Sequence, residues 1–170
     1  MNILFDSHTF DVGPQGTTTF LAELLNALPE AAQDRALALT LTCAAEDPAH
    51  VTRFVEVPHR FEPMRGGFVA RNLLSLPRLT RTAGVDAVVS QYARPFRSGV
   101  PTVSAIHDVL FLDFPESFSW RYRATRRLLF GWAARNSDVV ITISDYSRER
   151  IAHHFDVPLD RIDVLPCGAN

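Results

Sequence analysis

Residues 139–148 read VVITISDYSR, a pattern that joins the end of a strand to the start of a helix. The apolar run Val139–Ile141 is continuous, as in a strand that is covered on both faces of a parallel sheet. Ser144 follows directly and is a good N-cap, and Asp145 favours the first turn of a helix because of the helix dipole. We therefore predict a strand that leads at once into a helix, Asp145–Phe155.

The same alternation extends outward over the whole chain. Short apolar runs predict strands at Asn2–Asp6, Ala36–Thr42, Arg53–Val57, Asp86–Ser90, Pro101–Ile106, Asp138–Ile143 and Ile162–Leu165. Helical spacing predicts Thr17–Leu28, which Pro29 ends, Phe68–Thr82, which Pro77 kinks or splits, and a long helix within Pro115–Asn136. Alternating strands and helices indicate right-handed crossovers, so the fold class is α/β, with a parallel sheet and helices on both faces over residues 1–170.

Composition narrows the class of protein further. The chain has 170 residues and a net charge of -2, so it has no overall bias toward nucleic acid. No apolar run is long enough to span a bilayer, and Met1–Asp6 lacks the basic start of a signal peptide, which favours the cytoplasm. All 17 basic residues are arginine, which excludes a P-loop lysine or a Schiff-base lysine. Cys43 and Cys167 are far apart, so we predict no metal site.

Ligands of parallel sheets bind beyond the carboxyl ends of the strands, which directs attention to the first loop. Gly13 and Gly16 precede a helix, where backbone N–H groups can approach a phosphate, and Thr17 can cap that helix or bind a ligand. An ordinary loop glycine with an N-cap threonine explains the pattern equally well. Dinucleotide binding, as in a reductase, is disfavoured because the G-x-G-x-x-G spacing is missing and the second strand ends without a carboxylate.

Two more strand ends carry candidate side chains. His107 and Asp108 follow a buried strand, and an imidazole there can donate or accept a proton, although a structural hydrogen bond at the strand end is the simpler interpretation. Capping accounts for Ser144 and Asp145, but it leaves Tyr146 unexplained at the ligand edge. His153 and His154 are adjacent on a helix and point apart, so we interpret them as surface residues.

The predicted long helix is strongly basic. Glu116–Asn136 holds five arginines and one glutamate. At about 100° per residue, Arg123, Arg126 and Arg127 share one face, and Phe130 lies among them. A phenylalanine in a basic stripe is able to dip into an anionic membrane surface, so peripheral membrane contact is one hypothesis. A solvated face with one incidental aromatic is the preferred alternative.

The ordered motifs together resemble a known family. His107-Asp108-Val109, Phe114-Pro115, Val139–Arg148 and Ile162–Gly168 occur in the order typical of the N-terminal domain of GT-B glycosyltransferases of family 4, the group 1 glycosyltransferases. The glycine-containing first loop resembles that family as well, so the resemblance covers the whole chain. It implies a Rossmann-like acceptor domain, followed in the family by a donor-binding domain that this chain does not contain.

The resemblance also implies roles for the candidate residues. Gly13, Gly16 and Thr17 would face the donor diphosphate. His107 would contact the transferred sugar, and Asp108 would be a general base only in an inverting enzyme. Ser144, Asp145 and Tyr146 would line the cleft.

The family's reaction is retaining and passes through an oxocarbenium-like state. It uses a nucleotide-sugar as co-substrate and needs no further cofactor. A metal ion is not strictly required. The acceptor would be a glycan or a lipid, as in cell-envelope polysaccharide synthesis, in the cytoplasm or at the inner face of the membrane. The isolated domain would be inactive. The alternative function is a non-catalytic α/β domain that binds a ligand or regulates another protein.

Overall fold

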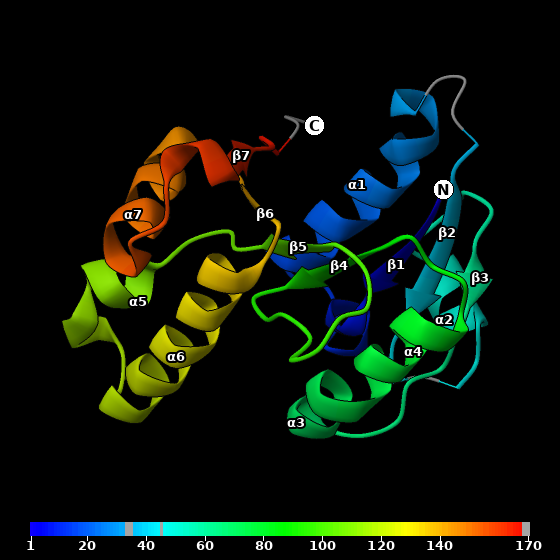
Figure 1. The fold of residues 1–170 in the computed structure, drawn as a ribbon, viewed down its shortest axis with the longest axis horizontal. Helices are drawn as coiled ribbons and strands as arrows, with labels where there is room; N and C mark the ends of the chain where they lie inside the picture. Colours follow the sequence, from blue (N-terminus) through cyan, green and yellow to red (C-terminus); the bar gives the residue numbers. More distant parts are fainter. Residues whose placement is uncertain (33–35, 45, 168–170) are drawn as a thin grey trace. The chain divides into compact units, whose positions relative to one another are not determined.

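The predicted α/β class is confirmed. The computed structural model describes residues 1–32, 36–44 and 46–167. Within these residues, seven parallel strands form a Rossmann-like sheet in the order β3-β2-β1-β4-β5-β6-β7. The chain divides into two compact units: unit 1 comprises Met1–Val89 and Pro95–Pro101, and unit 2 comprises Ser90–Arg94 and Thr102–Asn170. In Figure 1, the blue helix α1 belongs to unit 1, and the long yellow helix α6 belongs to unit 2.

The N-terminal part of the chain, up to β4, holds these elements: β1 (Asn2–Asp6), the 3-10 helix η1 (His8–Asp11), α1 (Gly16–Ala31), β2 (Ala38–Thr42), α2 (Ala49–Thr52), β3 (Arg60–Phe61), α3 (Phe68–Ala70), the π-helical η2 (Arg71–Ser75), α4 (Leu76–Thr82) and β4 (Ala87–Gln91). Residues alternate between the two faces of a strand. On one face of unit 1, Leu4 of β1 packs with Val88 of β4 and Leu76 of α4.

Unit 2 continues with β5 (Thr102–Ala105), α5 (Leu110–Asp113), η3 (Pro115–Ser117), α6 (Trp120–Asn136), β6 (Val139–Thr142), α7 (Asp145–Phe155), η4 (Leu159–Arg161) and β7 (Ile162–Val164). Its core joins Val140 of β6 and Ile162 of β7 to the aromatic side chains of Phe111, Phe130 and Phe155. The predicted helix Asp145–Phe155 is confirmed residue for residue, and the Ser144 side chain caps it.

Two local predictions about unit 1 are wrong. Arg53–Val57 forms no strand. The edge strand β3 instead lies at Arg60–Phe61 and pairs with β2 over two residues. Pro29 does not end α1, which continues to Ala31. A proline in the last turn removes one N–H from the helix ladder, and the remaining turn tolerates this loss.

The prediction that the helix Phe68–Thr82 is split is confirmed. The segment Phe68–Thr82 consists of a short α-helix, a π-helical stretch and a second α-helix, and Pro77 lies in the first turn of that last helix. Proline suits a first turn because its missing N–H would have no partner there.

The predicted orientation of α6 is also wrong. Phe130 was expected on an outward basic face with Arg123, Arg126 and Arg127, but it is only 4% exposed. Its ring stacks on Tyr92 at 5.0 Å between centroids and meets Phe111 edge-on at 5.3 Å. The Arg126 guanidinium lies over the Phe130 ring, 5.7 Å from its centroid, as in a cation–π contact. The aromatic cluster of unit 2 therefore turns the Phe130 side of α6 inward, whereas Arg127 stays exposed.

Among the described residues, no helix combines the length and the apolar character that a membrane crossing requires.

Candidate functional site

The first loop of unit 1 is built from short-range hydrogen bonds. Gly13 has a φ of +95°, a left-handed conformation that favours glycine. The Thr18 hydroxyl donates to the carbonyl oxygens of Gly13 and Thr9, at 2.9 and 3.1 Å, and so ties the loop to the first turn of α1. Thr18 thus has a structural role, whereas its neighbour Thr17, the predicted ligand or capping residue, is half-buried.

Gly16 is the first residue of α1 and is exposed. A Cβ atom added there would meet nothing within 4 Å, so packing does not require this glycine. The N-cap residue Gln15 makes no side-chain capping bond, and the first turn contains no acidic residue. The partial positive charge of this helix end is therefore available to an anion, which is the property predicted for the loop.

A buried charged cluster lies at the end of β1, and the sequence analysis missed it. The Asp6 carboxylate is 3.6 Å from Nε of Arg71 and 3.2 Å from Nδ1 of His8. Nε of Arg71, Nδ1 of His8 and Oδ1 of Asn72 are buried without a hydrogen-bond partner among the described residues. Unsatisfied buried polar atoms are rare in folded proteins and often mark a ligand site.

In unit 2, His107 follows β5 and is 6% exposed. Its backbone carbonyl accepts a bond from the Thr142 hydroxyl at 3.2 Å, which holds this strand end against β6. Burial lowers the pKa of the imidazole below its ordinary value of 6.5, and the Asp108 carboxylate opposes this only in part. His107 is therefore neutral at pH 7 and can donate or accept one hydrogen bond without carrying charge. The Asp108 carboxylate accepts a bond from the Leu110 N–H at 3.1 Å, just before α5.

Tyr92 is a second residue that the sequence analysis did not single out. It has a positive φ of 58°, which is unusual for a bulky side chain. Its ring lies 5.3 Å from the His107 ring and stacks on Phe130. Burial, reinforced by the Asp108 carboxylate, raises the pKa of the Tyr92 hydroxyl well above its ordinary value of 10.0. A protonated phenol thus lies beside a neutral imidazole.

The residues that begin α7 are engaged locally. The Ser144 hydroxyl accepts from the Ser147 N–H at 3.1 Å, so the capping interpretation is confirmed for this residue. Asp145 is exposed in the first turn. Tyr146 is 57% exposed, and its hydroxyl lies 3.4 Å from the Asp113 carboxylate, to which it donates. The cleft-lining role of all three residues stays a prediction.

Asp113 itself is the centre of an unpredicted cluster. Its carboxylate accepts from Nε of Arg150 at 2.7 Å and lies 2.7 Å from Nε2 of His154. Burial alone would raise the pKa of Asp113, but the bonds from Arg150 and His154 outweigh it and hold the pKa below its ordinary value. His154 is therefore half-buried and paired, so its interpretation as a surface residue is wrong, while His153 is exposed.

One group of three metal-ligand side chains occurs among the described residues. Ligand atoms of Asp11, Cys43 and His50 lie within 4.8 Å of one another. The His50 imidazole already lies 3.0 Å from the Phe10 carbonyl through Nε2 and 3.1 Å from the Arg53 guanidinium through Nδ1. Both ring nitrogens are thus occupied by protein groups, and a metal ion would have to displace one of them.

Comparison with protein families gives a match over almost the whole described chain. The model of glycosyltransferase family 4 matches residues 14–170, which include every strand end described above except that of β1. No significant match was found among curated proteins. Gly168, the last residue of the motif that begins at Ile162, lies outside the described residues.

Proposed function

Because the chain belongs to glycosyltransferase family 4, we propose that it is the acceptor-side domain of a retaining glycosyltransferase. The complete enzyme would transfer a hexose from a nucleotide-sugar to a glycan or lipid acceptor in the cytoplasm. Its donor-binding domain would lie outside this chain. The observation that carries the proposal is His107, a buried and neutral imidazole at the carboxyl end of β5 in a chain of this family.

A neutral imidazole suits this reaction. The bond from the anomeric carbon to the diphosphate breaks, its electron pair leaves on the diphosphate oxygen, and positive charge develops on the sugar ring. A protonated histidine nearby would repel that charge, whereas a neutral one can accept a hydrogen bond from a sugar hydroxyl and stabilise it. Burial of His107, with the adjacent ring of Tyr92, supports the neutral form.

The first loop supports the proposed donor diphosphate contact. The uncapped N-terminus of α1 offers N–H groups and partial positive charge, and the space before Gly16 is open. A diphosphate leaving group stabilised in this way needs no metal ion from this chain. Gly13 would preserve the loop conformation that exposes this helix end.

The test is His107→Ala in the complete enzyme. Loss of a hydrogen bond made mainly in the transition state lowers kcat by about 100-fold and raises KM much less. His153→Ala, which removes an exposed imidazole from α7, is the matched control and leaves both constants unchanged. NMR of the product should show the anomeric configuration of the donor. An unchanged kcat for His107→Ala would return this residue to a structural role, and an inverted product would contradict the retaining mechanism.

A further inference from the structure

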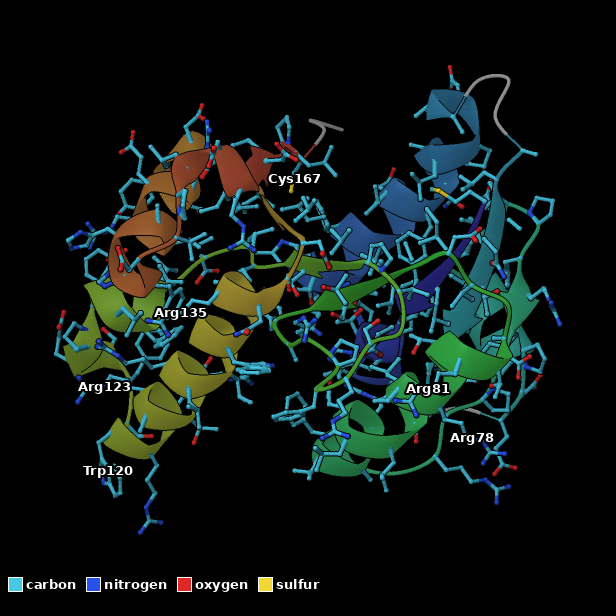
Figure 2. All side chains as sticks on the ribbon, in the orientation of Figure 1. Arg78, Arg81, Trp120, Arg123, Arg135 and Cys167 are labelled. Atoms are coloured by element: carbon cyan, nitrogen blue, oxygen red, sulfur yellow. The ribbon has the colours of Figure 1, made fainter. Side chains whose placement is uncertain are left out.

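The outward face of α6 carries apolar side chains at every fourth position, and three of the four are large. Trp120 is 67% exposed and Leu128 is 73% exposed, with the exposed Ala124 between them and Trp132, 36% exposed, beyond them. Residues four apart lie one above the other on a helix, so these four side chains form one continuous stripe. Figure 2 shows Trp120 at the start of α6 and Arg135 near its end. We call this surface the Trp120 face.

Arginine side chains alternate with the apolar stripe. Arg121, Arg127 and Arg135 are exposed, and Nε of Arg135 donates to the Phe155 carbonyl at 2.9 Å. The Arg121 guanidinium lies over the Trp120 ring at 5.5 Å, and Arg127, Leu128 and Trp132 line a shared hollow. The Trp120 face therefore combines apolar anchors with positive charge.

The helix itself contributes no negative side chain to this face. The 17 residues of α6 contain five arginines and neither aspartate nor glutamate. Within the described ranges, no α6 arginine forms an ion pair with a carboxylate. The exposed guanidinium groups of Arg121 and Arg127 thus remain able to bind anions from outside the chain.

We propose that the Trp120 face binds the surface of an anionic lipid bilayer, with α6 lying in the plane of the interface. Tryptophan is enriched at membrane interfaces because its ring is apolar and its N–H is polar. Arginine beside it gains from phosphate contacts and from the negative surface potential of anionic lipids. The membrane contact expected from the sequence is thus reassigned from the buried Phe130 to the opposite side of the helix. This proposal does not depend on the proposed sugar-transfer function.

The chain provides its own probe for the test. Its two tryptophans, Trp120 and Trp132, both lie on the Trp120 face. Vesicles of 30% phosphatidylglycerol in phosphatidylcholine at low salt should shift the tryptophan emission of the 170-residue chain to the blue, and brominated lipids should quench it. Vesicles of phosphatidylcholine alone should do neither, and added salt should weaken the binding.

Two variants separate the contributions of charge and apolar contact. An arginine near an anionic surface contributes about 1 kcal/mol, a factor of about five, so Arg121→Glu/Arg127→Glu should weaken vesicle binding by about 25-fold or more. Arg60→Glu/Arg65→Glu makes the same change in net charge at two exposed residues of unit 1 and should bind as the wild type does. Leu128→Ser keeps every charge and should weaken binding through the lost apolar contact.

Circular dichroism confirms that each variant is folded. Equal weakening by the control pair would reduce the effect to net charge and overturn the proposal. Sedimentation with vesicles without a change in tryptophan emission would place the contact elsewhere on the chain and also overturn it. Absence of vesicle binding by the wild type would do the same and would leave the Trp120 face to a protein partner.

Discussion

The His107 imidazole links the candidate site to the stability of the fold. Its pKa is lowered by burial, so between that lowered value and 6.5 the unfolded chain binds a proton that the folded chain does not. The free energy of unfolding therefore rises with pH in this window and falls as the pH drops below 6.5. We expect the chain to lose stability between pH 7.5 and pH 5.5, with a measurable share coming from His107.

Urea unfolding of the wild type and His107→Gln at the two pH values checks this expectation. Glutamine keeps a hydrogen-bonding group but cannot be charged, so the variant should lose less stability on acidification than the wild type does. The other histidines are present in both proteins, and their effects cancel in the comparison. An equal loss of stability in both proteins would show that His107 does not resist protonation.

The sequence identifies some site residues and misses others for a physical reason. His107 and Ser144 were predicted because each follows an apolar run directly, and position relative to a strand is a local property. Arg71 and Asp113 were not, since each acquires its partner through folding: Arg71 reaches Asp6, and Asp113 reaches Arg150 on another helix. No local pattern marks a single arginine or aspartate as half of such a pair.

Among the helices, α6 and α7 approach closely at one glycine. A Cβ atom added to Gly131 would lie 3.1 Å from Cδ1 of Phe155, which is only 1% exposed. Alanine is better than glycine within a helix by about 1 kcal/mol, but overpacking a core costs about 1–3 kcal/mol. We expect Gly131→Ala to lower the free energy of unfolding by about 1 kcal/mol in urea titrations.

The matched change is Gly16→Ala at the exposed start of α1. Space around that residue is open, so this variant should be as stable as the wild type or slightly more stable. If Gly131→Ala proved equally neutral, the Phe155 ring would have room to move, and the close packing of α6 on α7 would not depend on glycine.

The reversed orientation of α6 shows when helix periodicity does not predict which side of a helix is buried. The large apolar side chains of α6 are spread over much of its circumference, so no single apolar arc decides which side is buried. They are Tyr122, Leu128, Leu129, Phe130 and Trp132. The deciding factor is the aromatic cluster with Tyr92 and Phe111, which comes from other segments. By contrast, the bounds of α7 were predicted correctly, because the Ser144 cap is a local signal.

For the molecule as a whole, the proposed division of labour predicts an inactive chain. Binding of a nucleotide-sugar would depend mainly on a second domain, so the 170-residue chain should transfer no sugar and should bind the donor only weakly, with a Kd above about 1 mM. Calorimetry with nucleotide-sugars checks this. Micromolar binding by this chain alone would contradict the division and favour a ligand-binding or regulatory domain.

The sheet was predictable at this scale, apart from one edge. Alternating strands and helices require parallel pairing, and the five strand pairs that the structure describes are all parallel. The failure at Arg53–Val57 occurs next to β3, which pairs over only two residues. So short an edge strand depends on its neighbour more than on its own sequence.

The division of β4 between the two units has a consequence for synthesis on the ribosome. Unit 1 includes Pro95–Pro101, whereas the intervening Ser90–Arg94 belongs to unit 2. The growing chain therefore delivers the first piece of unit 2 before the last piece of unit 1. Neither unit is one uninterrupted stretch of polypeptide, so a single cut in the chain cannot release either of them as a complete product.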